Sequence, residues 1–436
     1  MKKVIVIGAG AAGLMAACAA ADAGARVIVL EHNEKAGKKL FITGKGRCNY
    51  SNACENQDFF ANVLRNPKFL YSAIYSFDSA AMTAFLQENG CPTKEERGKR
   101  LFPASDHAYD VTDALVRHLR RSGGELRFHK DVTEILVSDT QHVQGVMLSD
   151  GQRISADAVV VATGGRSYPS TGSAGAGYRL AEKLGLKVEK TKPSLVPLTV
   201  GEAWPMRLQG LALKNVAVSV ESPSGKHRPI YQGFGELLFT HFGISGPLIL
   251  SASCHMDFTQ DHPWYLLHLD LKPALSREEL EASLLRRASA SPKRELRNVL
   301  KTFLPERLAE ETARLYALKE GGPSAQAGEN QPFCTLNDKQ RSHLARLMKD
   351  IPITVTGTRG FEEAIVTRGG VSVKEINPST MEAKRAAGVF FAGEILDVDA
   401  YTGGYNLQIA WSTGHLAGEN AARCRENADE RKEENH

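Results

Sequence analysis

The sequence has little of what builds a disulfide framework or a zinc site. Its 436 residues include seven cysteines, an odd number, and no two of them form a Cys-x-x-Cys pair. Small secreted domains and structural zinc sites instead space their cysteines in pairs. The pattern therefore favours a protein whose thiols stay reduced, and we expect a cytoplasmic location.

The net charge of the chain is also small. The chain has 54 Lys and Arg against 50 Asp and Glu, a net charge of +4. So small an excess does not favour a nucleic-acid partner, and a small-molecule ligand is expected. The stretch Lys293–Arg297 could be taken as a basic patch for RNA, but glutamates intersperse the cations, which is typical of a solvated amphipathic face.

Long hydrophobic runs are almost absent. The one uncharged stretch of note is 4–21, VIVIGAGAAGLMAACAAA. Alanine and glycine dominate it, and three glycines interrupt it, unlike a signal peptide or a membrane anchor. We therefore expect no membrane span.

Hydrolytic and metal-dependent catalytic motifs are missing as well. The chain contains no HExxH motif, no paired-carboxylate motif and no recognisable Ser/His/Asp set. The catalytic residues are therefore left unassigned. His241, in FTHFGISGP, is the acid–base candidate, and a structural histidine capping that turn is the alternative.

What is present begins at the N-terminus with a strand–turn–helix–strand pattern. Val4–Ile7 is a β-branched run of the kind buried in a parallel sheet, and residues 8–13 read Gly-Ala-Gly-Ala-Ala-Gly before a helical stretch. A second strand over Arg26–Leu30 leads into Glu31. This order predicts a Rossmann-like nucleotide-binding unit within a doubly wound parallel α/β fold.

Each part of this motif has a physical role. Gly8 permits the tight turn, Gly10 lets a pyrophosphate approach the backbone, and Gly13 lets the helix pack closely on the strand. The N-terminus of the helix offers free N–H groups to phosphates. Glu31 can accept hydrogen bonds from the ribose hydroxyls of an adenosine, and it disfavours a 2′-phosphate.

Three later segments favour FAD over NAD. The cationic, glycine-rich stretch 37–52 stands where an NAD domain would continue with a helix and a strand, and it cannot be aligned with a Walker loop. The strand 158–162 runs into Thr163-Gly164-Gly165, and the strand 389–392 runs into Gly393-Glu394. These turns resemble the second dinucleotide contact and the ribityl contact of FAD enzymes. FAD is the predicted cofactor, and NAD(P)H is a candidate transient electron donor.

Three long motifs carry a closer resemblance. They are GKKLFITGKGRCNYSN (37–52), VTRGGVSVKEINPSTMEAK (366–384) and GVFFAGEILDVDAYTGGYNLQIAWSTGHLAG (388–418). They resemble the bacterial NAD(P)/FAD-dependent oxidoreductases variously labelled aminoacetone-oxidase-like or bile-acid-reductase-like. The resemblance implies hydride transfer between flavin and a small molecule, in enone reduction or amine oxidation. An FAD-dependent RNA-modifying enzyme and a flavin-binding protein without turnover are the alternatives.

The resemblance also implies that 43–49 acts as a flavin clamp, with Arg47 or Asn49 near the cofactor. Cys48 beside Arg47 could be an acidified thiolate, but a structural thiol is favoured because it has no partner cysteine. The predicted FAD contacts are Gly8, Gly10, Ala11, Ala12, Gly13, Glu31, Lys38, Lys39, Thr43, Gly44, Gly46, Arg47, Cys48, Asn49, Val132, Ala162, Thr163, Gly164, Gly393, Glu394, Gly404, Asn406 and Leu407.

The spacing of these motifs predicts a discontinuous, glutathione-reductase-like FAD domain. Its first part covers 1–192 and its second part 351–425, and the tail 426–436 is expected to be disordered. The insert 193–350 is expected to be β-rich over 193–272 and helical over 273–350. Because such an insert leaves and re-enters the FAD domain, we expect it to act as a lid over the flavin.

Overall fold

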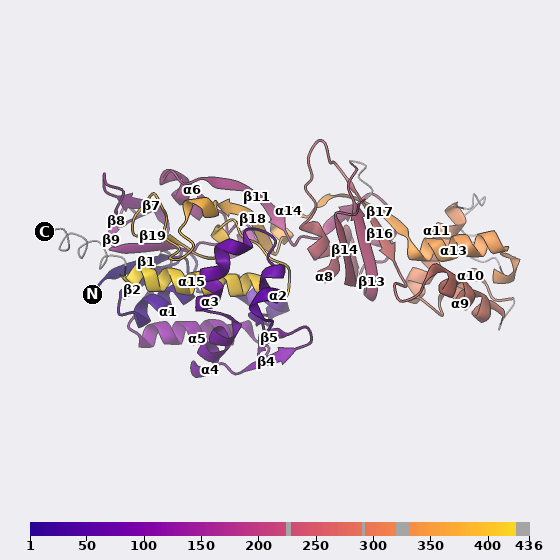
Figure 1. Ribbon diagram of the computed structural model, residues 1–436, viewed down its shortest axis with the longest axis horizontal. Helices are drawn as coiled ribbons and strands as arrows, with labels where there is room; N and C mark the ends of the chain where they lie inside the picture. The colour runs from indigo at the N-terminus through magenta and orange to yellow at the C-terminus, as the bar shows by residue number, and fades with distance from the viewer. Residues whose placement is uncertain (224–227, 290–292, 320–331, 424–436) are drawn as a thin grey trace. The chain divides into compact units, whose positions relative to one another are not determined.

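The computed structural model describes residues 1–223, 228–289, 293–319 and 332–423, which form two compact units (Figure 1). Unit 1 comprises Met1–Ser194 and Gly360–His436, and unit 2 comprises Leu195–Arg359. The predicted tail 426–436 lies outside the described residues.

A parallel sheet forms the centre of unit 1. Its five strands follow the order β19-β10-β1-β2-β6, and every neighbouring pair is parallel. Val4, Ile5 and Val6 in the central strand are fully buried, as expected for a strand covered on both faces. The α/β class and the Rossmann-like sheet predicted from the sequence are confirmed. The bounds are β1 Lys3–Ile7, β2 Arg26–Leu30, β6 Glu125–Arg127, β10 Ala158–Val161 and β19 Val389–Phe391.

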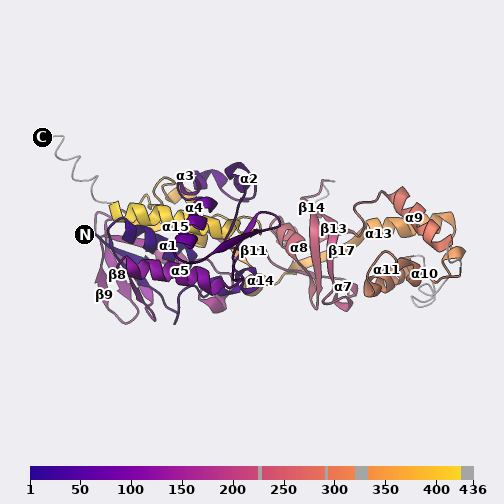
Figure 2. The same cartoon turned by 90° about the horizontal axis from the view of Figure 1, so that it is seen from below.

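Two helices from opposite ends of the chain, α1 (Ala11–Asp22) and α15 (Tyr405–Arg423), run side by side against this sheet (Figures 1 and 2). Their backbones nearly touch. A Cβ at Gly414 would lie 2.4 Å from the carbonyl oxygen of Ala12, and one at Gly418 would lie 2.1 Å from that of Ala16. The small residues of 4–21 therefore serve close helix packing. Within the described ranges, no helix combines the length and apolarity needed to cross a membrane.

Smaller elements complete unit 1. Two three-stranded antiparallel sheets and one two-stranded sheet flank the core, β3-β5-β4, β7-β8-β9 and β11-β18. The strands are β3 Ser51–Asn52, β4 Thr93–Glu96, β5 Arg100–Pro103, β7 Val132–Val137, β8 Val143–Leu148, β9 Arg153–Ser155, β11 Val188–Ser194 and β18 Val366–Val371. The α-helices are α2 Asn56–Ala61, α3 Tyr71–Ser76, α4 Ser79–Glu88, α5 Ala108–Arg121, α6 Ala176–Lys183 and α14 Gly360–Glu363. The 3₁₀ helices are η1 Leu40–Gly46, η2 Pro67–Leu70, η3 Pro169–Thr171, η5 Val373–Glu375 and η6 Gly393–Ile395.

Unit 2 is a closed antiparallel barrel with helices that share its hydrophobic core. The barrel order is β12-β15-β14-β13-β16-β17. The strands are β12 Leu198–Val200, β13 Ala212–Glu221, β14 Tyr231–Thr240, β15 Gly243–Ser245, β16 Tyr265–Asp270 and β17 Ile351–Thr358. The helices are α7 Trp204–Arg207, α8 Pro247–Ser253, α9 Arg277–Ser289, α10 Leu296–Leu300, α11 Glu306–Lys319, η4 Phe333–Thr335 and α13 Asp338–Lys349.

The second boundary of the insert differs from the expected one. The sequence placed Ile351–Thr358 in the returning FAD domain, whereas this segment is β17 and pairs with both β12 and β16. Ile351, Ile353 and Val355 are buried inside the barrel. The chain therefore returns to unit 1 at Gly360, because one more strand is needed to close the barrel.

Candidate cofactor site

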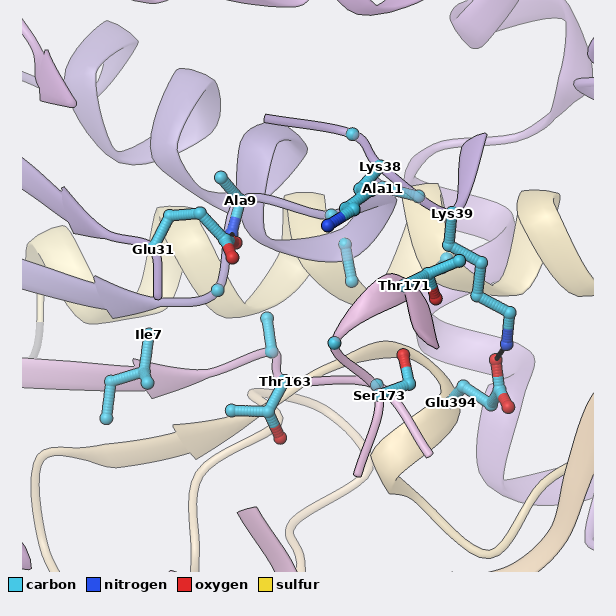
Figure 3. Close-up of a pocket in the computed structure, with 18 of the residues that line it drawn as sticks. Ile7, Ala9, Ala11, Glu31, Lys38, Lys39, Thr163, Thr171, Ser173 and Glu394 are labelled. Atoms are coloured by element: carbon cyan, nitrogen blue, oxygen red, sulfur yellow. Dashed lines mark hydrogen bonds and ion pairs between the residues drawn. The ribbon is translucent and has the colours of Figure 1, made fainter. Parts of the chain in front are cut away.

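A cavity of about 400 Å³ lies at the carboxyl ends of the parallel strands, and all of its lining residues belong to unit 1 (Figure 3). Ile7, Leu30, Ala162 and Ala392 mark the four strand ends that it touches. Nucleotides bind outside the carboxyl ends of strands in open α/β sheets. The cavity thus stands where the fold places a dinucleotide.

Most of the predicted contacts line this cavity. They come from the first strand–turn–helix, from the loop behind Glu31, from the start of β7, from the turn after β10, from η6 and from the first turn of α15. These residues are Gly8, Gly10, Ala11, Ala12, Glu31, Lys38, Lys39, Thr43, Val132, Ala162, Thr163, Gly164, Glu394, Asn406 and Leu407.

The three glycines of the first motif have separate structural roles. Gly8 has a φ of +100°, which disfavours any other residue in this turn. A Cβ at Gly13 would lie 1.9 Å from the carbonyl oxygen of Gly8, so only glycine lets α1 approach β1 this closely. A Cβ at Gly10 would meet nothing within 4 Å, because this residue faces the open cavity. Gly10 caps α1 without any side-chain hydrogen bond, which leaves the helix N-terminus available to an anion.

Glu31 is held ionised at the end of β2. Its Oε2 accepts a hydrogen bond from the Ala9 N–H at 2.7 Å, and its Oε1 accepts from the Asn33 N–H at 2.8 Å. Burial acts to raise the pKa of Glu31, but hydrogen bonds from His32, Asn33 and Ala9 outweigh it and hold the pKa below its usual value. Figure 3 shows the carboxylate directed toward Ala9. Oε1 also accepts a hydrogen bond from Asn33 Nδ2 at 2.9 Å and lies 3.1 Å from His32 Nδ1, so the acceptor capacity that remains for a ribose hydroxyl is on Oε2.

A hydrogen-bonded network of three side chains, Lys39, Ser167 and Glu394, joins three distant segments of the chain beside the cavity. Lys39 Nζ lies 2.6 Å from Ser167 Oγ and 2.7 Å from Glu394 Oε2, and Ser167 Oγ donates to Glu394 Oε1 at 2.6 Å. The Thr367 N–H also donates to Glu394 Oε1, at 2.9 Å. In Figure 3, the side chains of Lys39 and Glu394 point toward each other. This network fixes an acidic side chain at the cavity wall with a cation next to it.

One hydroxyl at the cavity has no partner in the described part of the chain. Thr163 Oγ1 is buried and makes no hydrogen bond there, although Thr163 lines the cavity. Gly177 lies against this hydroxyl, since a Cβ on it would come within 2.0 Å of Thr163 Oγ1. Buried hydroxyls are normally hydrogen-bonded, so an unpartnered one fits a site that receives a polar ligand. With the open glycine and the uncapped helix, it makes the donor set suitable for a dinucleotide.

Several lining residues were not predicted from the sequence. Asn33, Lys130, Asp131, Ser173 and Arg179 all contribute to the cavity wall. Asn33 and Asp131 lie near strand ends, where polar side chains are a usual signal of a site. Arg179 lies within α6, and no local pattern singles it out.

Arg47 does not line the cavity, and two carboxylates engage its side chain instead. Its guanidinium donates to Asp106 Oδ1 at 2.8 Å, forms a further ion pair with Glu96 and covers the ring of Phe102 at 4.3 Å. Lys94 also contacts Asp106, at 2.7 Å. Arg47 is not among the residues that line the cavity, so the arrangement does not support a guanidinium clamp on the flavin.

Cys48 is also outside the cavity lining. It is fully buried, and burial raises the pKa of its thiol to about 12. A thiol with such a pKa is protonated at neutral pH, which contradicts the alternative of an acidified thiolate.

The other predicted contacts that do not line the cavity include Asn49 and Gly404, which hold the backbone in place. Asn49 has an amide whose favoured orientation accepts from the Gly404 N–H at 3.1 Å and donates to the carbonyls of Leu101 and Ser51. Gly404 itself has a φ of +100°. The other predicted positions that do not line the cavity are Gly13, Gly44, Gly46 and Gly393.

Asn406 and Leu407, the two predicted contacts at the start of α15, both line the cavity. The Asn406 side chain accepts from the Ala400 N–H at 3.0 Å and donates to the Ala400 carbonyl at 2.7 Å, so it braces the preceding loop. Leu407, in the first turn of α15, lines the cavity. His241 belongs to unit 2, where it is exposed in the turn between β14 and β15.

The comparisons with known proteins agree with this geometry. The family model described as "HI0933-like protein Rossmann domain" matches residues 2–420. The chain is 33% identical over 430 residues to the 3-dehydro-bile acid delta(4,6)-reductase of Clostridium scindens, covering 97% of this chain and 99% of the relative. It is 32% identical over 409 residues to the ribosomal RNA dihydrouridine synthase of Escherichia coli, covering 94% and 95%.

Solved structures support the fold. The 3-ketosteroid-delta4-(5alpha)-dehydrogenase of Rhodococcus jostii RHA1 matches with a TM-score of 0.51 and 17% identity, covering 97% of each chain. At this identity the likeness concerns the fold alone. The length of the family match and of the two relatives, together with the site geometry, shows that the chain belongs to the HI0933-like family of Rossmann-fold, FAD-binding oxidoreductases.

Proposed function

We propose that this protein is an FAD-dependent reductase that adds two hydrogens across a carbon–carbon double bond conjugated to a carbonyl group. The observation that carries the proposal is the shared chemistry of two relatives with different substrates. A dehydro-bile-acid reductase acts on a steroid, and a dihydrouridine synthase acts on a pyrimidine in RNA.

The two named reactions have one bond change in common. In a 3-keto steroid with a double bond at position 4, the double bond is conjugated to the ketone. In uracil, the C5–C6 double bond is conjugated to the C4 carbonyl. In both, a hydride adds to the carbon distant from the carbonyl, and a proton completes the saturated product. Neither of these two relatives is named for amine oxidation, so we favour reduction over the oxidative alternative.

FAD supplies the hydride in this proposal. The first turn of α1 would hold the pyrophosphate through its free N–H groups, and Glu31 would hold the adenosine through its ribose hydroxyls. The Lys39–Ser167–Glu394 network would hold the ribityl hydroxyls, since Glu394 presents a fixed acceptor at the cavity wall. The N-terminus of α15, where Leu407 lines the cavity, would favour negative charge on a bound flavin.

The electron donor is proposed to be NAD(P)H, bound transiently. The sequence has no second strand–GxGxxG–helix unit that would hold a resident dinucleotide. A donor that binds briefly, reduces the flavin and leaves is compatible with one dinucleotide site.

An anaerobic half-reaction tests the proposal. The FAD-loaded protein is reduced with NADPH, and a 4-ene-3-ketosteroid or a uridine-containing oligonucleotide is then added while the flavin absorbance is followed. We expect one of them to reoxidise the flavin, whereas the matched saturated ketone or dihydrouridine oligonucleotide leaves it reduced. If both unsaturated compounds are inert and a primary amine reduces the oxidised flavin, the direction of hydride transfer is opposite to the proposal.

A further inference from the structure

Glu394, the acidic side chain at the cavity wall, is held in place by a threonine behind it. The Thr367 N–H donates to Glu394 Oε1 at 2.9 Å. Thr367 Oγ1 in turn accepts from the backbone N–H of Arg166 at 2.7 Å and from that of Ser167 at 3.1 Å. Thr367 is fully buried, and it is not among the residues that line the cavity in the described part of the chain. One threonine therefore fixes both Glu394 and the loop that carries Ser167.

The packing around Thr367 leaves little room for a shift. A Cβ at Gly165 would lie 2.4 Å from Thr367 Oγ1 and 2.7 Å from Glu394 Oε1. The backbone of Gly165 therefore lies directly against both groups. Because interiors are close-packed, a displacement of Thr367 must displace Glu394 or the loop that begins at Gly165.

Thr367 also belongs to the strand pair through which the chain passes between the units. The chain leaves unit 1 after Ser194, the last residue of β11, and returns to it at Gly360. We call β11 the exit segment and residues 360–371, which include β18, the return segment. The two strands pair antiparallel, with Thr367 opposite Pro193.

Arg166 ties the loop to both segments. Its Nη1 donates to Thr191 Oγ1 in the exit segment at 3.2 Å. Its guanidinium lies 4.7 Å from the ring centroid of Phe361 in the return segment. The N–H of Tyr168 adds a hydrogen bond to the Phe361 carbonyl at 3.0 Å. Arg166 is exposed and is not part of the cavity lining, so its side chain serves the segments rather than a ligand.

The exit segment has a second contact with the surroundings of the cavity. Ser194 Oγ donates to Asp399 Oδ2 at 2.9 Å, and both residues are buried. Asp399 follows Val398, which lines the cavity. Two hydrogen-bonded paths, one through Thr367 and one through Asp399, thus run from the cavity wall to the segments.

We propose that Thr367 and Arg166 are positioning residues that couple the flavin site to the exit and return segments, so that bound FAD orders the passage between the two units. The inference rests on the proposed function, which assigns the ribityl hydroxyls to Glu394. A ligand that binds Glu394 in this orientation also stabilises the hydrogen bonds that set the orientation. Opening of β18 at Thr367 breaks one of those bonds, so bound FAD opposes the opening.

Hydrogen–deuterium exchange tests the coupling. It is measured on the FAD-loaded protein, on the cofactor-free protein and on the cofactor-free protein with ADP. ADP has the adenosine and the pyrophosphate but no ribityl chain, so it cannot engage Glu394 as FAD does. A ligand at about 100 times its Kd can slow an opening that abolishes its binding by about 100-fold. We expect FAD to slow exchange in 188–194 and 366–371 by about tenfold or more and ADP to change it less than about twofold.

The first variant removes the hydroxyl that joins the loop to β18. In Thr367→Val, compared with the parent at equal FAD occupancy, FAD should slow exchange in the return segment by no more than about twofold. Thr367→Ser keeps the hydroxyl and should behave as the parent does. Thr93→Val is the matched control, since it removes a hydroxyl from β4 that accepts only a side-chain hydrogen bond from Gln87 among the printed contacts of that strand.

The second variant leaves the buried hydrogen bonds intact. Arg166→Met removes the guanidinium but keeps the backbone N–H that donates to Thr367. FAD affinity should stay unchanged, and the protection of the return segment should remain. The protection of the exit segment should fall about threefold or more, because its contact through Thr191 is lost. Arg153→Met, which removes an exposed cation of β9, is the control and should change neither segment.

The coupling is wrong if FAD does not slow exchange in the two segments, if ADP slows it as much as FAD does, or if Thr367→Val keeps the full effect of FAD. None of these measurements uses a substrate, so the proposed reductase chemistry is tested separately. Protection by FAD without flavin reoxidation by either unsaturated compound would retain the coupling and contradict the function. Flavin reoxidation without protection by FAD would retain the function and contradict the coupling.

Discussion

Two glycine-rich stretches of unit 1, residues 8–13 and residues 43–49, differ in how they relate to the cavity. In the first, Gly8 and Gly10 line the cavity, and Gly13 sets the distance between α1 and β1. In the second, Thr43 lines it, but Arg47 faces two carboxylates and Cys48 is buried. The difference shows that a glycine-rich, cationic composition does not by itself place side chains at a ligand.

The largest expected effect comes from the close approach in the first stretch. Gly13→Ala places a Cβ within 1.9 Å of the Gly8 carbonyl oxygen, and neither backbone can move without separating α1 from β1. We expect it to lower the free energy of unfolding by about 3 kcal/mol, measured by urea denaturation. Gly10→Ala is the matched control, because its Cβ meets nothing within 4 Å, and it should leave apoprotein stability unchanged while weakening FAD binding. Equal destabilisation by both would contradict the separation of roles.

The next effect concerns Glu31 and FAD retention. Glu31→Gln keeps the shape of the side chain and removes its charge, and charge-assisted hydrogen bonds to a ribose would be lost. We expect FAD binding to weaken by about 1–3 kcal/mol, measured by flavin fluorescence on dilution. Unchanged FAD affinity would count against the ribose role.

The same residue gives a pH dependence of apoprotein stability. The folded pKa of Glu31 is lower than its usual 4.5, so its stabilising contribution is fully present above about pH 4.5 and is lost as the pH falls through the folded value. The difference in unfolding free energy between the parent and Glu31→Gln should therefore shrink as the pH falls below about 4.5. Because Glu31 also raises the pKa of His32, the difference should also fall as the pH rises through the folded value of His32. A difference that grows on acidification below about pH 4.5 would show that the carboxylate is not stabilised by folding.

A further contrast uses two cations, Lys39 at the cavity and Arg47 in the second stretch. Lys39→Met breaks the network with Ser167 and Glu394 at the cavity and should weaken FAD binding by about 1 kcal/mol. Arg47→Met breaks ion pairs that are partly exposed, so its effect on FAD affinity should be near zero. The opposite order, measured by the same fluorescence titration, would restore the clamp predicted for Arg47 from the sequence.

The smallest effect is expected at Cys48. Cys48→Ala leaves a small buried void and should cost about 1 kcal/mol of unfolding free energy, with FAD content and flavin reduction unchanged. Because the pKa of the thiol is raised to about 12, alkylation of native protein at neutral pH should be slow at this position. Rapid alkylation with loss of turnover would revive the thiolate alternative.

These contrasts also show what the sequence could predict. The first motif is local: strand, turn and helix are contiguous, so Gly8–Glu31 could be placed at the cavity without knowledge of the rest of the fold. The partners of Lys39 are 128 and 355 residues away, and those of Arg47 are 49 and 59 residues away. Nothing in the local pattern distinguishes these two cations. Strand pairing determines which of them faces the ligand.

The insert also shows that local sequence patterns do not predict long-range pairing. Its β-rich and helical composition was visible in the sequence, but the barrel closes through β17, which follows the helical part of the chain. The pairing of β17 with β12 joins residues about 160 positions apart, such as Leu198 and Thr358, and short-range periodicity contains no information on such pairing. The boundary at Gly360 therefore became evident only from the fold.

The most direct test of the central claim, that the cavity is an FAD site built on residues 8–31, identifies the cofactor that the protein carries. The purified protein is denatured, and the supernatant is analysed by mass spectrometry. We expect FAD, because in the proposed site the α1 N-terminus and Glu31 would together recognise the adenosine diphosphate half of the molecule. Release of FMN, or a colourless protein that does not take up added FAD, would contradict the account.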